Sequence, residues 1–334
     1  YNSDLNFQWA KNAGTEGVEY GYKISSDQWG NFYVTGVAGP GTAFDDFELE
    51  ADGVYIAKYN SQGDATGLTY HSGNGVNSIS SNHSGEGYIT GRLTGSATFP
   101  AENPFSISSY QGTDDGYVAQ FDTALNWNWA KIATGPGSNK GRAVFSDAEG
   151  NAFVAGSFQQ EITLNDTTTI SGLETDNAYL AKYSSQGDLK YVKSSLGTGA
   201  NIPTAVAHKN ETAYLSGWFA ESLSFDSTLA TTNNIDLFLV SITEKVNGTY
   251  LPTHINNKAI YVYPNPAKDF IKISGENLAI DSQISIYNSH GKVITKTNSV
   301  NAEKGINLQK IPAGLYVVLV ENSHQNHTIK FIKQ

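Results

Sequence analysis

Hydrophobic and polar residues alternate over short runs along most of the chain, and Gly, Asn and Asp residues separate the runs. The runs are rich in β-branched and aromatic residues, for example 54–59 and 315–321. A period of two with these residue types predicts β-strands, and the intervening residues favour tight turns. No comparable stretch shows the helical period of 3.6 residues. The pattern therefore predicts an all-β protein.

Three hydrophobic blocks recur along residues 1–245. The first block ends in a glycine, and its four copies lie at residues 31–36, 87–91, 151–156 and 213–217, with closing glycines Gly36, Gly91, Gly156 and Gly217. The second block has copies at 54–59, 117–121, 179–183 and 238–242. The third block has copies at 7–11, 68–71, 127–131 and 190–193. Such self-similarity at about 60 residues indicates a repeat architecture.

About four strands in each repeat are typical of a β-propeller blade. We therefore predict a β-propeller of at least four blades over residues 1–245. The chain begins with a copy of the third block, whereas its last repeat lacks one. We expect residues 7–11 to complete the sheet that contains 236–242, because this pairing would close the ring and remove two exposed edges.

The pattern changes after Lys245. Residues 246–258 are polar and contain one Pro and one Gly, which indicates a linker. Residues 259–334 contain seven short alternating runs, and this number predicts a small seven-stranded, Ig-like β-sandwich. The predicted strands are 260–263, 270–274, 283–288, 292–297, 305–308, 315–321 and 328–333.

Composition narrows the possible functions. The 334 residues carry 21 basic and 32 acidic side chains, a net charge of −11, and the only arginines are Arg92 and Arg142. Nucleic acid is an unsuitable partner because such a chain lacks a surface that neutralises phosphates. The absence of cysteine excludes disulfides and thiolate chemistry, and no apolar run spans a bilayer. The chain begins at Tyr1 without a signal peptide, which predicts a mature form or a fragment.

The repeats resemble the SBBP family of bacterial extracellular proteins, which is related to seven-bladed propellers. The shared core is an Asp-x-x-Gly-Asn turn followed by a strand and a glycine, as in residues 27–36 and 147–156. The resemblance covers roughly residues 1–245. It implies a propeller on an extracellular protein.

The C-terminal region resembles the type A sorting domain of the type IX secretion system of Bacteroidetes. Four blocks match in order: 262–267 with Ile271, 284–288 with 291–293, 311–317, and 330–334. The resemblance implies a cargo that is secreted or displayed at the cell surface after it crosses the periplasm and outer membrane. Its partners would be the outer-membrane translocon and the shuttle barrel, recognised through residues 259–334. The implied export-signal residues are Pro264, Asn265, Pro266, Gly291, Gly314, Tyr316, Lys330, Phe331, Ile332 and Lys333.

Candidate chemistry in the repeats is sparse. The acids Asp27 and Asp147 repeat at turn positions, so we interpret them as turn residues. No metal-binding spacing, nucleophile elbow or phosphate loop occurs, and we predict no cofactor, no metal and no catalytic residues. The residue after each repeat glycine does vary, as Val37, Arg92, Ser157 and Trp218. The side chains best suited to stack on a sugar or hold an acidic group are Trp29, Arg92, Arg142 and Trp218.

Two functions remain open for the repeats. The preferred hypothesis is a ligand-binding or adhesion module, with an extracellular glycan as the candidate ligand. The alternative is a polysaccharide-active enzyme with paired carboxylates in the propeller channel. Packing of Trp218 between blades is also consistent with the sequence. Three short motifs resemble Bacteroidetes O-glycosylation sites and predict modification at Thr123, Thr167 and Ser227.

Overall fold

The computed structural model describes residues 7–165, 167–225, 228–243, 261–263, 267–274, 278, 282–288, 292–321 and 326–333. The fold is all-β, as predicted, apart from one short helix, α1 (Ser299–Lys304). The chain divides into two compact units. One contains Tyr1–Glu221 and Thr232–Ile255, and the other contains Ser222–Thr231 and Asn256–Gln334. In the described part of the chain, no helix is long and apolar enough to cross a membrane. The linker predicted at 246–258 lies outside the described residues.

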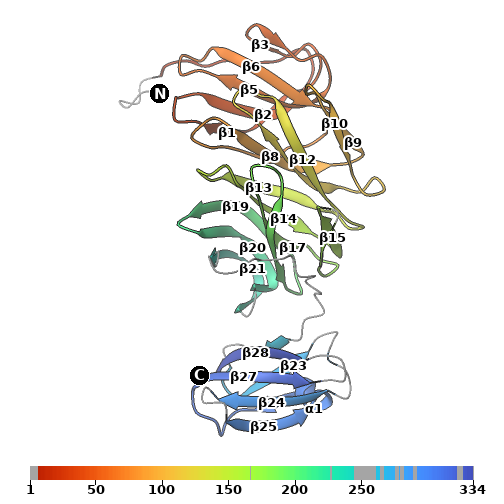
Figure 1. Cartoon of the computed structure of the whole chain (residues 1–334), viewed down its shortest axis with the longest axis vertical. Coiled ribbons are helices and arrows are strands. Elements are labelled where there is room, and N and C mark those ends of the chain that lie inside the picture. The colour runs from red at the N-terminus through yellow and green to blue at the C-terminus, as the bar shows by residue number, and fades with distance from the viewer. Residues whose placement is uncertain are drawn as a thin grey trace. The chain divides into compact units, whose positions relative to one another are not determined.

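The recurring sequence blocks occupy equivalent strands of successive antiparallel sheets (Figure 1). We number the repeats 1 to 4 and define them as residues 20–71, 78–134, 140–196 and 201–243. The first strands are β1 (Tyr20–Ser26), β7 (Ser78–Ser81), β13 (Lys140–Ser146) and β19 (Asn201–Lys209). The second strands are β2 (Phe32–Ala38), β8 (Gly87–Leu93), β14 (Ala152–Phe158) and β20 (Thr212–Phe225). The third strands are β5 (Gly53–Tyr59), β11 (Asp115–Phe121), β17 (Asn177–Tyr183) and β21 (Thr228–Thr243), and the fourth strands are β6 (Ala65–His71), β12 (Trp127–Thr134) and β18 (Leu189–Leu196).

A short hairpin follows the second strand in repeats 1 to 3. These hairpins are β3 (Ala43–Phe44) with β4 (Phe47–Glu48), β9 (Ser96–Phe99) with β10 (Phe105–Ser108), and β15 (Glu161–Leu164) with β16 (Thr168–Ser171). In repeat 3, β15 pairs with β12 of repeat 2, so the hairpin extends the sheet of the preceding repeat. In repeat 4 the long strand β20 neighbours β18 of repeat 3 in the same way. Strand pairing thus joins repeats 3 and 4 to the repeats before them, whereas repeat 2 is joined to repeat 1 by a backbone hydrogen bond from the Ser72 N–H to the Thr98 carbonyl oxygen at 3.2 Å.

Apolar side chains fill the layers between successive sheets. One core cluster joins Tyr33 and Ile56 of repeat 1 to Ile79 and Ile89 of repeat 2. Another joins Tyr88 and Val118 of repeat 2 to residues of repeat 3. The period of two along each strand explains this arrangement, because alternate residues face the preceding and following sheets. The hydrophobic effect therefore stabilises the stack of repeats as well as each sheet.

The predicted closure by residues 7–11 is not observed. These residues form no strand and belong to no sheet among the described residues. Instead, the indole of Trp9 packs edge-on against Phe32, with ring centroids 6.4 Å apart, and its Nε1 donates a hydrogen bond to the Ser61 carbonyl oxygen at 3.2 Å. The proposed partner strand, β21, lies at the opposite end of the repeat region (Figure 1). A lone extended segment without an edge partner cannot satisfy its backbone groups as a strand does.

The C-terminal unit contains the seven predicted strands in two sheets. The first sheet has the order β22 (Tyr261–Tyr263), β23 (Phe270–Ser274) and β26 (Ile306–Asn307). The second has the order β25 (Val293–Asn298), β24 (Gln283–Asn288), β27 (Gly314–Glu321) and β28 (Asn326–Lys333). A single buried cluster, which includes Ile271, Ile284 and Val318, fills the space between them. The side chain of Asn298 caps α1 by accepting a hydrogen bond from the Asn301 N–H at 3.0 Å.

Candidate functional site

One end of the repeat sheets gathers the positions that vary between repeats. We call it the glycine-end rim, and it consists of the four residues after the repeat glycines and the acids before the third strands. Cross-strand pairing places these positions together, because Arg92 lies opposite Gly116 and Ser157 lies opposite Ala178. The rim residues are Val37, Arg92, Ser157, Trp218, Asp52, Asp114 and Asp176.

Arg92 forms an ion pair at this rim. Its Nη1 lies 3.1 Å from Oδ2 of Asp114, and both side chains are partly exposed. The Thr94 hydroxyl also donates a hydrogen bond to Asp114. The Thr94 hydrogen bond and the positive charges of Arg92 and Lys140 lower the pKa of the Asp114 carboxyl below its usual value. Asp114 therefore stays ionised and holds Arg92 in a defined position.

Arg142 lies on the neighbouring repeat, close to Arg92. A Cβ atom placed on Gly141 would lie 3.1 Å from the carbonyl oxygen of Gly91, so the residues that precede the two arginines are in contact. The side chain of Arg142 is half-buried, and its Nε donates a hydrogen bond to Ser157 Oγ at 3.2 Å. Burial lowers the pKa of the guanidinium, and the negative charge of Asp176 opposes this shift. An arginine always carries its charge at neutral pH, so Arg142 places a positive charge at the rim beside the negative charge of Asp176.

The two candidate tryptophans occupy different places. Trp218 is half-buried at the glycine-end rim and lies opposite Ile202 of β19. Trp29 lies in the turn between β1 and β2, at the other end of the sheet, and is 61% exposed. The structure therefore places Arg92, Arg142 and Trp218 at the same rim, whereas Trp29 does not belong to this group.

The sequence did not indicate a cavity at the same rim of repeat 1. Its volume is about 520 Å³, and segment 15–19 lines it together with residues of repeat 1 and of segment 72–74. Glu19 and Asp52 contribute carboxylates to the lining, and Val18 and Val37 contribute apolar surface. Glu19 is itself held by Thr15, whose hydroxyl donates to Oε1 at 2.6 Å. The cavity was missed because segment 15–19 has no counterpart in the repeat pattern.

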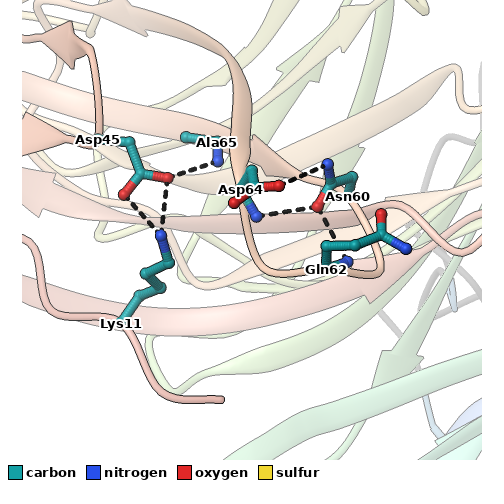
Figure 2. Close-up of polar contacts among 6 residues, drawn as sticks. All are labelled: Lys11, Asp45, Asn60, Gln62, Asp64 and Ala65. Carbon is teal, nitrogen blue, oxygen red and sulfur yellow. Dashed lines mark hydrogen bonds and ion pairs between the residues drawn. The ribbon is translucent and has the colours of Figure 1, made fainter. Parts of the chain in front are cut away.

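The repeated acids act as turn residues. Asp27 Oδ1 accepts hydrogen bonds from the backbone N–H groups of Trp29 and Asn31, both at 2.9 Å. Asn60 does the same for Gln62 and Asp64 in the turn between β5 and β6, as Figure 2 shows. Side-chain acceptors of this kind close the turn by satisfying its free donors. Within the described ranges, no three His, Asp or Glu side chains lie close enough to hold a metal ion.

His71 is a buried imidazole at the end of β6. Its Nδ1 accepts a hydrogen bond from the Gly73 N–H at 3.0 Å, so the proton of the neutral ring resides on Nε2, which lies 3.1 Å from the Tyr117 hydroxyl. The ring also stacks on Phe99, with centroids 4.5 Å apart. Burial lowers the pKa of His71 from 6.5 to about 3. This environment accommodates the neutral imidazole and makes His71 a packing residue.

The lowered pKa makes an acid-sensitive contribution to stability. Because the unfolded chain binds the proton near pH 6.5 and the folded chain only near pH 3, the contribution is complete above pH 6.5 and is lost as the pH falls toward 3. We expect the free energy of unfolding to fall by up to about 1.4 kcal/mol per pH unit in this window. Urea unfolding of wild-type protein and His71→Gln at pH 7 and pH 4.5 measures the effect. The variant should show a smaller pH dependence, whereas exposed His83→Gln should behave as wild type.

The export-signal residues of the C-terminal unit lie in several environments. Tyr316 and Phe331 are core residues, 4% and 1% exposed, with ring centroids 5.5 Å apart. The Tyr316 hydroxyl donates to the Pro312 carbonyl oxygen at 2.8 Å, and Gly314 has a φ of 156°. Ile332 is 49% exposed on the edge strand β28, and its carbonyl oxygen accepts a hydrogen bond from the Ala267 N–H. The remaining members are Lys330 and Lys333, both on β28, and Pro264, Asn265, Pro266 and Gly291, which lie outside the described residues.

The terminal strand β28 is only partly accessible. Phe331 points into the core because it alternates with Ile332 along β28. Of the predicted glycosylation sites, Thr123 and Thr167 are exposed, and Ser227 lies outside the described residues.

Comparison with known proteins identifies this unit. Residues 261–334 match the family model described as the secretion system C-terminal sorting domain. These residues are a C-terminal sorting domain. The sorting domain marks proteins that are exported to the cell surface or secreted, so this protein is a secreted or cell-surface cargo. The sorting domain also implies interaction with the secretion machinery.

The repeat region has no such identification. No curated protein matches the chain. Among solved structures, the chain is similar to the extracellular domain of a protein described as a hybrid two-component system from B. thetaiotaomicron, with 11% sequence identity and a TM-score of 0.29. The match covers 100% of this chain and 47% of that chain, so this chain spans about half the length of that domain.

Proposed function

We propose that the repeat region is a propeller-type module that binds an extracellular anionic glycan and that the sorting domain delivers it to the cell surface or the medium. Binding is preferred to catalysis because the repeated acids Asp27 and Asp147 are engaged in turns. The repeat sheets would be the blades, with the first strands innermost. The observation that carries the proposal is the pair of neighbouring arginines at the glycine-end rim.

The placement of the two arginines supports an anionic ligand. Residues 1–245 contain 12 basic and 27 acidic side chains, a balance of −15 that repels anions at long range, so the attraction of an anionic ligand would come from the two arginines at the rim. Arginine binds carboxylates and sulfates through two parallel hydrogen bonds. Trp218 at that rim adds an aromatic face of the kind that stacks on sugar rings. A uronate-containing or sulfated polysaccharide would satisfy both features.

A binding screen tests this function. Wild-type protein and Arg142→Gln would be titrated with neutral, uronate-containing and sulfated oligosaccharides, and each mixture would be assayed for released reducing ends. We expect binding of anionic oligosaccharides only, with an affinity roughly tenfold lower in Arg142→Gln, equivalent to about 1.4 kcal/mol. Lys190→Gln is the matched control, because Lys190 is an exposed cation of the same repeat and lies away from the rim.

The same screen separates the two functions. Affinity for an anionic glycan without product release supports the binding module. Product release that a single rim or cavity carboxylate variant abolishes, such as Glu19→Gln or Asp52→Asn, would establish the alternative enzyme. Equal affinity of wild type and Arg142→Gln would contradict the assignment of the ligand to the rim.

For the C-terminal unit, we propose that its two sheets form an Ig-like sandwich that the outer-membrane translocon and its shuttle barrel recognise. Support comes from the match of residues 261–334 to the sorting-domain family and from the single apolar core of the two sheets. Crosslinking of the intact cargo to membrane fractions would test this recognition. Crosslinks are expected from exposed positions of the sorting domain, such as Lys296, and not from the glycine-end rim.

A further inference from the structure

The last repeat exposes a sheet face that is buried in the repeats before it. We call it the repeat-4 face and define it as Tyr214, Leu237 and Leu239, which are 41%, 81% and 70% exposed. The corresponding positions of repeats 1 to 3 are 0–3% exposed wherever they carry a large side chain. These counterparts are Tyr33, Tyr88 and Phe153 for Tyr214, Ile56, Val118 and Leu180 for Leu239, and Val54, Gly116 and Ala178 for Leu237.

In earlier repeats, the first strand of the following repeat covers this face. Ile79 of β7 is 6% exposed and belongs to the same core cluster as Tyr33 and Ile56. Val144 of β13 is likewise 6% exposed and belongs to the cluster of Tyr88 and Val118. The equivalent residue of the first repeat is Ile24, which is 63% exposed. The two ends of the repeat region therefore present the two halves of one apolar interface.

The N-terminal segment, residues 7–11, occupies the place of a fourth strand that belongs to a preceding repeat. In repeat 2, the fourth-strand residue Trp129 donates from Nε1 to the Ser185 carbonyl oxygen of repeat 3 at 2.9 Å. Trp9 makes the same contact with Ser61 of repeat 1 at 3.2 Å. Lys11 fixes the segment further, because its Nζ lies 3.0 Å from Oδ1 of Asp45 in the hairpin β3–β4 (Figure 2). The segment therefore contacts repeat 1 as the fourth strand of a preceding repeat would, although it belongs to no sheet among the described residues.

Repeat 4, by contrast, lacks a fourth strand among the described residues. Strand β21 pairs with β20, and no fourth strand lies on its outer edge among the described residues. In repeat 2, Ala130 of the fourth strand lies opposite Ala119 of β11. Applied to the sequence blocks, this register places Ala10 opposite Val240 of β21. The same register would bring the Trp9 indole onto Tyr214, as the rings of Trp129 and Tyr88 now lie 5.6 Å apart.

We propose that two copies of the chain associate head to tail, with residues 7–11 and repeat 1 of one copy completing the sheet and covering the repeat-4 face of the other. The contact continues the interface that already joins successive repeats, in backbone pairing as well as in apolar packing. A second copy is the occupant because the two ends lie at opposite ends of the repeat region (Figure 1). Since the two surfaces differ, the contact is heterologous and produces a closed ring or a longer assembly.

Disulfide trapping tests the proposal directly, because the chain contains no cysteine of its own. The double variant Ala10→Cys/Val240→Cys would be oxidised and separated on a non-reducing gel. Directly opposed residues of antiparallel strands have Cα atoms about 4.5–5.5 Å apart, a separation that permits a disulfide. We expect covalent species of two or more chains. The single variants and the out-of-register pair Ala10→Cys/Thr243→Cys are controls and should yield at least fivefold less of these species.

A second measurement does not depend on cysteine. Leu237→Ser/Leu239→Ser removes two exposed apolar side chains, so the variant should remain folded while its sedimentation shifts from the assembly to the monomer. Three results would overturn the proposal: a crosslink within one chain only, no crosslink beyond that of the controls, or a wild-type protein that sediments as a monomer at 100 μM.

Discussion

Removal of residues 261–334 is expected to abolish export of the protein, because these residues form its sorting domain. The truncated chain should accumulate inside the cell envelope, with at least a tenfold loss from the medium and cell surface. Immunoblots of periplasmic, outer-membrane and medium fractions would measure the distribution. The repeat region has its own core clusters, so the truncated protein should remain folded and detectable.

A point substitution should reproduce this loss if the folded sorting domain is what the machinery recognises. Val318 is completely buried in the sorting-domain core, and Val318→Asp would place an unpaired carboxylate there, at a cost of several kcal/mol. Gln283→Asp is the control, because Gln283 is exposed on the neighbouring strand β24. Export of Val318→Asp at the wild-type level would show that an unfolded tail is sufficient. Export of the truncated chain would contradict the role of the domain altogether.

The strands of this protein were predictable from sequence because their pattern is local. In the sorting domain, all seven predicted strands are present, since alternation of polar and apolar residues such as that in 283–286 indicates a strand with two different faces. The same alternation predicts that Phe331 and Ile332 face opposite sides. It does not show which side is the core. The structure shows that Phe331 faces the core and that Ile332 is exposed.

Contacts between repeats were less predictable because they depend on the arrangement of whole sheets. Residues 7–11 carry a strand-like block, and the sequence cannot show that their docking partner is Ser61 of repeat 1, with no sheet around them. For the same reason, only some of the candidate ligand-contact residues lie at the glycine-end rim. Arg92 and Arg142 lie at the same rim because the backbones at Gly91 and Gly141 are close, whereas Trp29, chosen for its side chain alone, lies at the other end of its sheet.

The repeat glycine is the position where the sequence pattern and the packing between strands agree most closely. First strands carry a bulge opposite it, as shown by the register shifts at Gly21/Lys23, Gly141/Ala143 and Pro203/Ala205. The bulge brings a backbone carbonyl onto the glycine. A Cβ atom on Gly36 would lie 1.7 Å from the Tyr20 carbonyl oxygen, and the corresponding distance for Gly217 to Ile202 is 2.1 Å. The glycine recurs because a side chain does not fit there.

Gly36→Ala is therefore expected to lower the free energy of unfolding by about 3 kcal/mol, the upper part of the range for overpacked sites. The added methyl cannot be relieved by rotation of a side chain, because it meets backbone atoms, and β1 would have to separate from β2. Gly21 is the cross-strand partner of Gly36 and provides a matched control. A Cβ atom on Gly21 meets nothing closer than the Tyr55 hydroxyl at 3.6 Å, so Gly21→Ala should change stability by less than about 0.5 kcal/mol. Urea unfolding followed by far-ultraviolet circular dichroism would compare the unfolding midpoints of the two variants. Equal midpoints would show that the bulge can rearrange around the added methyl with little loss of stability.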